Sequence, residues 1–298
     1  RQIQWVSAGL LRDLWRIEFK TDARAAFRGI DGFGLWESRT GLYFFDPPLE
    51  GDRDFYAQFY SKLTGLGLYS QTYIRHEFTM AARSIPAGAR VLDVGSGLAS
   101  FRSCLLPKAN YTGLDPHIAD KSKAAEIRGE TLAQHLIEHA GTYDAVCAFQ
   151  VLEHVTAPAI LFAEMVQAVR PGGQIFAGVP HVPSAMTRIP NFIINAPPHH
   201  LTWWTKPALA ELAKGAGAIV ESIENVPWSS SDALIYWIER CTLKKCNGEH
   251  YRGTWTWHAS AALGLIGGMI ANPLAGVPSG GGEGSGLLLT ARRAMDAQ

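Results

Sequence analysis

VLDVGSG, residues 91–97, is the stretch that decides the fold. An apolar run with β-branched residues, 90–94, breaks directly into Gly-Ser-Gly, and the residues that follow, 98–101, can open a helix. A strand, a tight glycine turn and a helix N-terminus form the usual cradle for a nucleotide-like ligand. Glycine suits the turn because the backbone must bend sharply and approach the ligand without a Cβ in the way. The pattern therefore predicts a ligand site at Gly95 and Gly97.

A second predicted strand ends in an acidic residue. Residues 110–115 are expected to be extended, and they end in Asp115, twenty positions after Gly95. A carboxylate at the tip of the second strand is placed to bind the two hydroxyls of a ribose. An ordinary turn aspartate before Pro116 would account for the residue type but not for its distance from Gly95.

Two cofactor classes use this arrangement, and the residues around the glycines discriminate between them. The dinucleotide fingerprint requires a third glycine, G-x-G-x-x-G, but Ser100 stands there. Asp93 lies two residues before Gly95, where dinucleotide-binding folds usually carry an apolar residue. A carboxylate at that position suits a ligand with a cationic amino-acid end, so NAD is the weaker of the two interpretations.

Later segments extend the pattern. Residues 143–149 predict a buried strand, and the loop after it carries Gln150, Glu153 and His154 at the carboxyl end, where open α/β sheets bind ligands. The series DVGSG, GLDP, YDAV…VLEHV and RPGG occurs in this order. Each motif is common alone, but the ordered set resembles the class I S-adenosylmethionine-dependent methyltransferases of the small-molecule and glycan-pathway type, similar to the ubiquinone-biosynthesis O-methyltransferase group. The resemblance covers roughly residues 70–225.

The resemblance implies a Rossmann-like, doubly wound α/β fold with a seven-stranded sheet whose last strand is antiparallel. The expected strands are 90–94, 110–115, 127–131, 143–149, 172–179, 218–224 and 286–292. The expected helices are 69–84, 99–107, 118–126, 131–139, 157–169 and 205–216.

We expect three parts of the chain. Residues 1–68 form an N-terminal extension with a short β element, and residues 69–225 with 286–298 form the methyltransferase domain. Residues 226–285 form an aromatic-rich insertion before the last strand, for which a substrate lid and an oligomer contact remain open.

S-adenosylmethionine is the cofactor that the resemblance implies. The residues expected to bind it are Asp93, Gly95, Gly97, Asp115, Gln150, Glu153 and Tyr73. In similar enzymes the helix that carries Tyr73 lies over the cofactor, although packing of Tyr73 in the core would explain this residue equally well.

Histidines are the candidates for the catalytic base. An oxygen acceptor with a high pKa needs a group that takes its proton, and histidine suits this near neutral pH. The loop PPHHLTWW, residues 197–204, follows the fifth strand, and related methyltransferases show a similar segment at the pocket. We predict His200 first, then His199, and then His154 after the fourth strand. For His199 and His200 the competing role is a structural hydrogen bond to a backbone carbonyl.

Composition excludes several function classes. Lys and Arg together number 27, as do Asp and Glu, so the basic surplus of a nucleic-acid binder is missing. The first cysteine is Cys104, so the cysteine zinc site of some relatives' N-terminal element cannot form, and no metal is expected. The scattered cysteines fit a reducing cytoplasm. The most apolar segment, 259–275, is broken by Asn272-Pro273 and lacks a basic polar face, so a buried or oligomer-forming helix is expected rather than a membrane segment.

The leading interpretation is a cytoplasmic S-adenosylmethionine-dependent methyltransferase that acts on a small polar or sugar-linked acceptor, most readily at oxygen, and that forms a homo-oligomer if the insertion is a subunit contact. An NAD(P)-dependent oxidoreductase and a non-catalytic protein that binds the cofactor or a partner are the alternatives.

Overall fold

The computed structural model describes residues 1–66, 74–107, 109–116, 126–278 and 283–295. The chain divides into two compact units. The first unit contains Arg1–Ser70, His181–Thr205 and Pro227–Gly286, and the second contains Gln71–Pro180, Lys206–Val226 and Leu287–Gln298. Among the helices of the described residues, none combines the length and apolarity needed to cross a bilayer.

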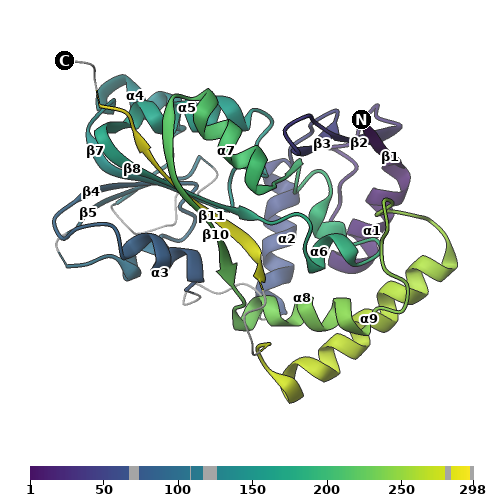
Figure 1. Ribbon diagram of the computed structural model, residues 1–298. Helices are drawn as coiled ribbons and strands as arrows, with labels where there is room; N and C mark the ends of the chain where they lie inside the picture. The colour runs from purple at the N-terminus through teal and green to yellow at the C-terminus, as the bar shows by residue number, and fades with distance from the viewer. Residues whose placement is uncertain (67–73, 108, 117–125, 279–282, 296–298) are drawn as a thin grey trace. The chain divides into compact units, whose positions relative to one another are not determined.

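The second unit is built on a seven-stranded sheet with the order β10-β11-β8-β7-β4-β5-β6 (Figure 1). The strands are β4 (Arg90–Val94), β5 (Asn110–Leu114), β6 (Ile127–Arg128), β7 (Tyr143–Phe149), β8 (Val169–Pro180), β10 (Ala218–Pro227) and β11 (Glu283–Arg293). The central strands β8, β7, β4, β5 and β6 pair in parallel. The expected seven-stranded α/β sheet with an antiparallel last strand is confirmed.

Apolar runs explain why the central strands form the core. In β4, Val91 and Leu92 are fully buried, and in β7 the run from Ala145 to Ala148 is at most 1% exposed. Strands covered on both faces read as continuous apolar runs, because crossover helices pack on each side of a parallel sheet. The helices of this unit are α3 (His76–Ala82), α4 (Leu132–His139), α5 (Pro158–Ala168) and α7 (Lys206–Gly215).

Three expected elements differ from the structure. The helix expected at 99–107 is only a 3₁₀ turn, Ser100–Cys104, because Ala99 adopts a left-handed conformation (φ 58°) that breaks regular helix at its start. The strand expected at 127–131 is two residues long, since Thr131 instead caps α4. Of the helix expected at 69–84, the described part begins at His76. The helix expected at 118–126 lies almost wholly outside the described residues.

The first unit combines a small sheet with helices. Its sheet has the order β1-β2-β3-β9, formed by β1 (Gln2–Ser7), β2 (Gly32–Glu37), β3 (Tyr43–Asp46) and β9 (Thr202–Trp203). Where one short β element was expected within residues 1–68, the structure has three strands, which are joined by a fourth from far along the chain. The helices are α1 (Ala8–Phe19), α2 (Arg53–Gly65), α6 (Ala185–Arg188), α8 (Ser230–Cys241) and α9 (Trp255–Ala275), with a 3₁₀ turn at Ile193–Asn195.

An aromatic cluster holds the first unit together. Trp15, fully buried on α1, packs edge-on against Phe55 and Phe59 of α2 at centroid distances of 4.9 and 5.3 Å. The Trp15 indole N–H donates to the Pro197 carbonyl at 2.8 Å. Because a buried indole needs a hydrogen-bond acceptor, this bond ties the loop before His199 to α1.

Candidate active site

A glycine turn follows β4 in the second unit. Gly95 and Gly97 both have positive φ, 68° and 51°. A Cβ added at Gly95 would come within 2.5 Å of the Val151 side chain. Two features of position 95 therefore require glycine: its backbone conformation, and the close approach of the loop after β7.

Asp115 lies directly beyond β5 and closes the turn. Its Oδ2 accepts a hydrogen bond from the Gly97 amide at 3.0 Å, and its carboxyl is half-buried. Since β7, β4 and β5 are neighbours and parallel, their carboxyl ends lie at one edge of the sheet. The structure thus brings together the glycine turn, Asp115 and the loop that begins at Gln150, which is the edge where open α/β sheets bind ligands.

Asp93 occupies a different environment from the turn that it precedes. Its carboxyl is 3% exposed and accepts a hydrogen bond from the Tyr111 hydroxyl at 2.7 Å. Burial raises the pKa of Asp93 to about 7, with a smaller contribution from the charge of Asp115, while the bond from Tyr111 lowers it. Tyr111 of β5 therefore holds the Asp93 carboxyl next to the glycine turn. Near neutral pH this carboxyl is protonated in part of the molecules.

Tyr111 is a site residue that the sequence analysis missed. It stands two positions before Gly113, which is the register partner of Asp93 in the parallel pair β4–β5. Gly113 lacks a side chain, and a Cβ there would lie 3.3 Å from the Tyr111 hydroxyl and 2.6 Å from Ser96 Oγ. Alternation of Tyr111 and Gly113 on one strand was the available signal, but it has meaning only once the register of the two strands is known.

Two buried carboxylates lie at the loop after β7, Glu153 in the loop itself and Glu77 on α3. Gln150 has φ 57°, and its side-chain amide donates to Glu77 of α3 at 3.1 Å. Glu153 is fully buried, and burial raises its pKa to about 8. Nε2 of His154 lies 3.8 Å from Glu153 Oε1, and the His154 side chain is 19% exposed. Gln150 is thus oriented by α3, while Glu153 is largely protonated at neutral pH.

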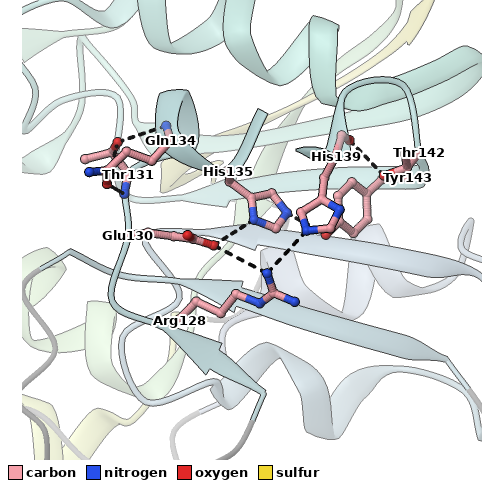
Figure 2. A network of polar contacts seen from close by, with 8 residues as sticks. All are labelled: Arg128, Glu130, Thr131, Gln134, His135, His139, Thr142 and Tyr143. Carbon is pink, nitrogen blue, oxygen red and sulfur yellow. Dashed lines mark hydrogen bonds and ion pairs between the residues drawn. The ribbon is translucent and has the colours of Figure 1, made fainter. Parts of the chain in front are cut away.

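A polar network supports the strand end next to Asp115 (Figure 2). Nδ1 of His135 lies 2.8 Å from Glu130 Oε1, and its Nε2 lies 2.6 Å from the Tyr143 hydroxyl. Arg128 extends toward both Glu130, at 3.6 Å, and the ring of His139. The Arg128 carbonyl accepts the Asp115 amide at 3.0 Å. The network therefore connects α4 and β7, through Arg128, to the backbone of Asp115, the residue predicted to bind the ribose.

The two adjacent histidines belong to the first unit. His200 is 6% exposed, and its Nδ1 lies 2.9 Å from Asn195 Oδ1. The Asn195 carbonyl accepts the Trp203 indole N–H at 2.8 Å, so Asn195 is held between β9 and the His200 ring. The His199 ring packs in the aromatic cluster, 4.7 Å from the Phe59 centroid. Tyr73, the remaining predicted cofactor residue, lies outside the described residues.

Comparisons with known proteins agree with the geometry. The family described as a methyltransferase domain matches residues 68–223. Two curated relatives are ubiquinone biosynthesis O-methyltransferases. The protein from Xanthomonas axonopodis pv. citri is 29% identical over 195 residues, which cover 56% of this chain and 79% of the relative. The protein from Aromatoleum aromaticum is 34% identical over 101 residues, or 30% of this chain and 43% of the relative.

A solved structure is also similar. The 1,6-didemethyltoxoflavin-N1-methyltransferase of Burkholderia thailandensis is 15% identical, covers 88% of this chain and 95% of its own, and has a TM-score of 0.49. The match of the family to more than half of the chain, together with the ordered motifs at the strand ends, places this protein: it belongs to the methyltransferase-domain family.

Proposed function

We propose that this protein transfers the methyl group of S-adenosylmethionine to an oxygen atom of a small polar or sugar-linked acceptor, and that a histidine takes the proton from that oxygen. The observation that carries the histidine role is the contact between His200 Nδ1 and Asn195 Oδ1. The names of the curated relatives, O-methyltransferases of ubiquinone biosynthesis, support oxygen as the acceptor atom.

The strand ends of the second unit suit the donor. When bound, S-adenosylmethionine supplies an already activated methyl group, so the protein needs to bind and orient rather than to activate. The Asp115 carboxylate has the geometry to accept ribose hydroxyls next to the Gly97 amide. Gly95 keeps the turn close to Val151 without a side chain between them. Gln150 and Glu153 lie at the carboxyl end of β7. The hydrogen bond from Tyr111 fixes Asp93, which precedes the glycine turn.

His200 has the hydrogen-bond pattern of an oriented base. An amide oxygen accepts but cannot donate, so the neutral imidazole of His200 carries its proton on Nδ1, facing Asn195 Oδ1. That tautomer places the basic lone pair on Nε2. Asn195 is itself held through its backbone by Trp203. His199, packed against Phe59 and Trp15, is the second candidate, and His154, beside Glu153, is the third.

The donor part of the proposal is tested by calorimetric titration of S-adenosylhomocysteine into the full chain. Asp115→Ala is expected to weaken binding about 10- to 100-fold, because hydrogen bonds to a charged group contribute roughly 1.5 to 3 kcal/mol each. NADH is the control ligand. Binding of NADH, or equal binding of S-adenosylhomocysteine by both proteins, would contradict the assignment.

The base is tested by turnover with a panel of phenolic and sugar hydroxyl acceptors and detection of the methylated product. His200→Gln is expected to lower kcat by roughly 10²- to 10⁴-fold with little change in S-adenosylhomocysteine affinity, as for removal of a general base. His76→Gln, at an exposed position of α3, is the matched control. Full activity of the His200 variant would transfer the role to His199 or His154, and methylation only of amines would refute an oxygen acceptor.

A further inference from the structure

The helix α9 of the first unit contains no charged residue. None occurs between Arg252 and Glu283 in the sequence. The buried residues of α9 are Trp257 and three small ones, Ser260, Gly264 and Gly268, and α9 packs against α8. A Cβ added at Gly268 would lie 2.6 Å from the backbone nitrogen of Ile238. The two helices therefore pack closely through small residues, and the large apolar side chains other than Trp257 are left on the other faces of α9.

Those large side chains are exposed. Their exposed fractions run from 45% to 82%. They are Trp255, Leu263, Leu265, Ile266, Met269, Ile270, Leu274 and, just beyond the helix, Val277. At 3.6 residues per turn they spread over about half of the helix circumference. A surface helix normally turns a polar face to water, so a continuous apolar face of this size marks an interaction surface.

Basic residues lie at the N-terminal end of the same helix. Residues 239–278, all described by the structure, contain four cations, Arg240, Lys244, Lys245 and Arg252, and two acidic residues. Glu239 pairs with Lys245 and Glu249 pairs with Arg252, so the segment has an excess of two cations. Lys244 is held beside α9, because its amide donates to Ser260 Oγ at 2.8 Å. The Arg252 guanidinium lies 5.6 Å from the centroid of the Trp257 ring. The whole chain has no net charge, so this excess of cations is local to α9.

We propose that α9 docks the protein onto the surface of an anionic lipid bilayer. The apolar outer face would enter the boundary of the acyl chains, and the neighbouring cations would meet the phosphates. The helix itself has no basic face, as its sequence indicates; the cations come from the segment 240–252, which the fold brings to its N-terminal end. Because α8 packs against one side of α9, only the outer side of the helix can enter the lipid, so the docking lies along the membrane surface.

Charge separates this partner from a second copy of the chain. Two copies that pack through α9 would each bring the same excess of two positive charges to the contact. The two carboxylates of the segment are already in ion pairs, Glu239 with Lys245 and Glu249 with Arg252. A bilayer with acidic headgroups supplies the missing negative charge, whereas another copy of this surface does not.

The experiment is flotation of the full chain with phosphatidylcholine vesicles, with and without roughly one third phosphatidylglycerol. The wild type is expected to bind the anionic vesicles and to be released by salt. The triple variant Ile266→Ser, Met269→Ser, Ile270→Ser should bind at least about tenfold more weakly, because the apolar face drives insertion. Ile137→Ser is the matched control, since that side chain is 84% exposed on α4; it should bind like the wild type.

The charge component and the competing partner have their own measurements. Arg240→Gln with Lys244→Gln should abolish the preference for anionic vesicles. Light scattering after size exclusion reports dimers, and binding of S-adenosylhomocysteine checks that each variant is folded. The proposal is overturned if the wild type fails to bind anionic vesicles, if the triple variant binds them equally well, or if α9 instead forms a dimer that the triple variant loses.

Discussion

Replacement of Asp93 by asparagine is expected to make the stability of the protein less sensitive to pH. Burial raises the pKa of this carboxyl from its ordinary value of 3.8 to about 7. A raised carboxyl pKa means that the folded protein keeps a proton that the unfolded chain releases. The free energy of unfolding of the wild type therefore falls as pH rises from about 4 to about 7, in the opposite direction to a salt-bridged aspartate.

The size of the effect follows from the two pKa values. One pKa unit corresponds to about 1.4 kcal/mol, so the shift at Asp93 costs the folded state about 3 to 5 kcal/mol once the carboxyl ionises in both states. Asparagine has a similar shape and can still accept the hydrogen bond of Tyr111, but it does not titrate. The stability of Asp93→Asn relative to the wild type should therefore rise by about 2 to 3 kcal/mol between roughly pH 5 and pH 7.5.

Urea unfolding at these two pH values measures the difference. Other buried carboxyls, such as Glu153, are present in both proteins, so their titration cancels in the comparison. Tyr111→Phe is the companion variant: loss of a bond that lowers the pKa of Asp93 should extend the pH dependence to higher pH. A stability difference between Asp93→Asn and the wild type that stays constant with pH would refute the reasoning.

Three further changes test the packing and charge of both units. Gly95→Ala should lower the free energy of unfolding by about 2 to 4 kcal/mol, because alanine would have positive φ and would overlap the Val151 side chain. Urea unfolding measures this change, and an unchanged stability would show that the turn is not constrained. Gly268→Ala should cost about 1 to 3 kcal/mol, since the new Cβ would overlap the backbone of Ile238, and an unchanged melting temperature would argue against close α8–α9 packing. Glu239 is buried between two cations that lower its pKa, so its stabilising contribution is lost as pH falls. Glu239→Gln should therefore cost about 1 to 3 kcal/mol at neutral pH and less in acid; an equal cost at both pH values would contradict the ion-pair role.

The sheet of the second unit could be predicted because its signals are local. Apolar runs such as 90–94 and 143–149 predict buried strands, and the glycine turn predicts where the first of them ends. The helix expected after that turn was wrong, because the left-handed conformation of Ala99 depends on how the turn closes rather than on helix propensity. The same local signals predicted Asp115 at the end of a strand. In the structure it lies there and accepts a hydrogen bond from the Gly97 amide.

Contacts between distant residues were beyond the sequence. Thr202 of β9 pairs with Phe44 of β3, and no sequence pattern in either segment predicts this pairing. The hydrogen bond of Tyr111 to Asp93 requires the register of β4 and β5. Asn195 becomes the partner of His200 only after the intervening 3₁₀ turn and loop fold back on each other.

The family followed from the resemblance of the ordered motifs alone. The sequence by itself also determined the α/β class and the strand ends that carry the cofactor candidates, because short-range hydrophobic periodicity and turn chemistry encode these two features. Only the tertiary structure decided which polar groups meet and which apolar faces stay exposed. The uncharged segment 259–275 predicts a buried or oligomer-forming helix, and within the chain α8 covers only its small-residue side and leaves Ile266 and Leu274 exposed. Burial depends on what packs against a helix, and that partner is chosen by the whole fold.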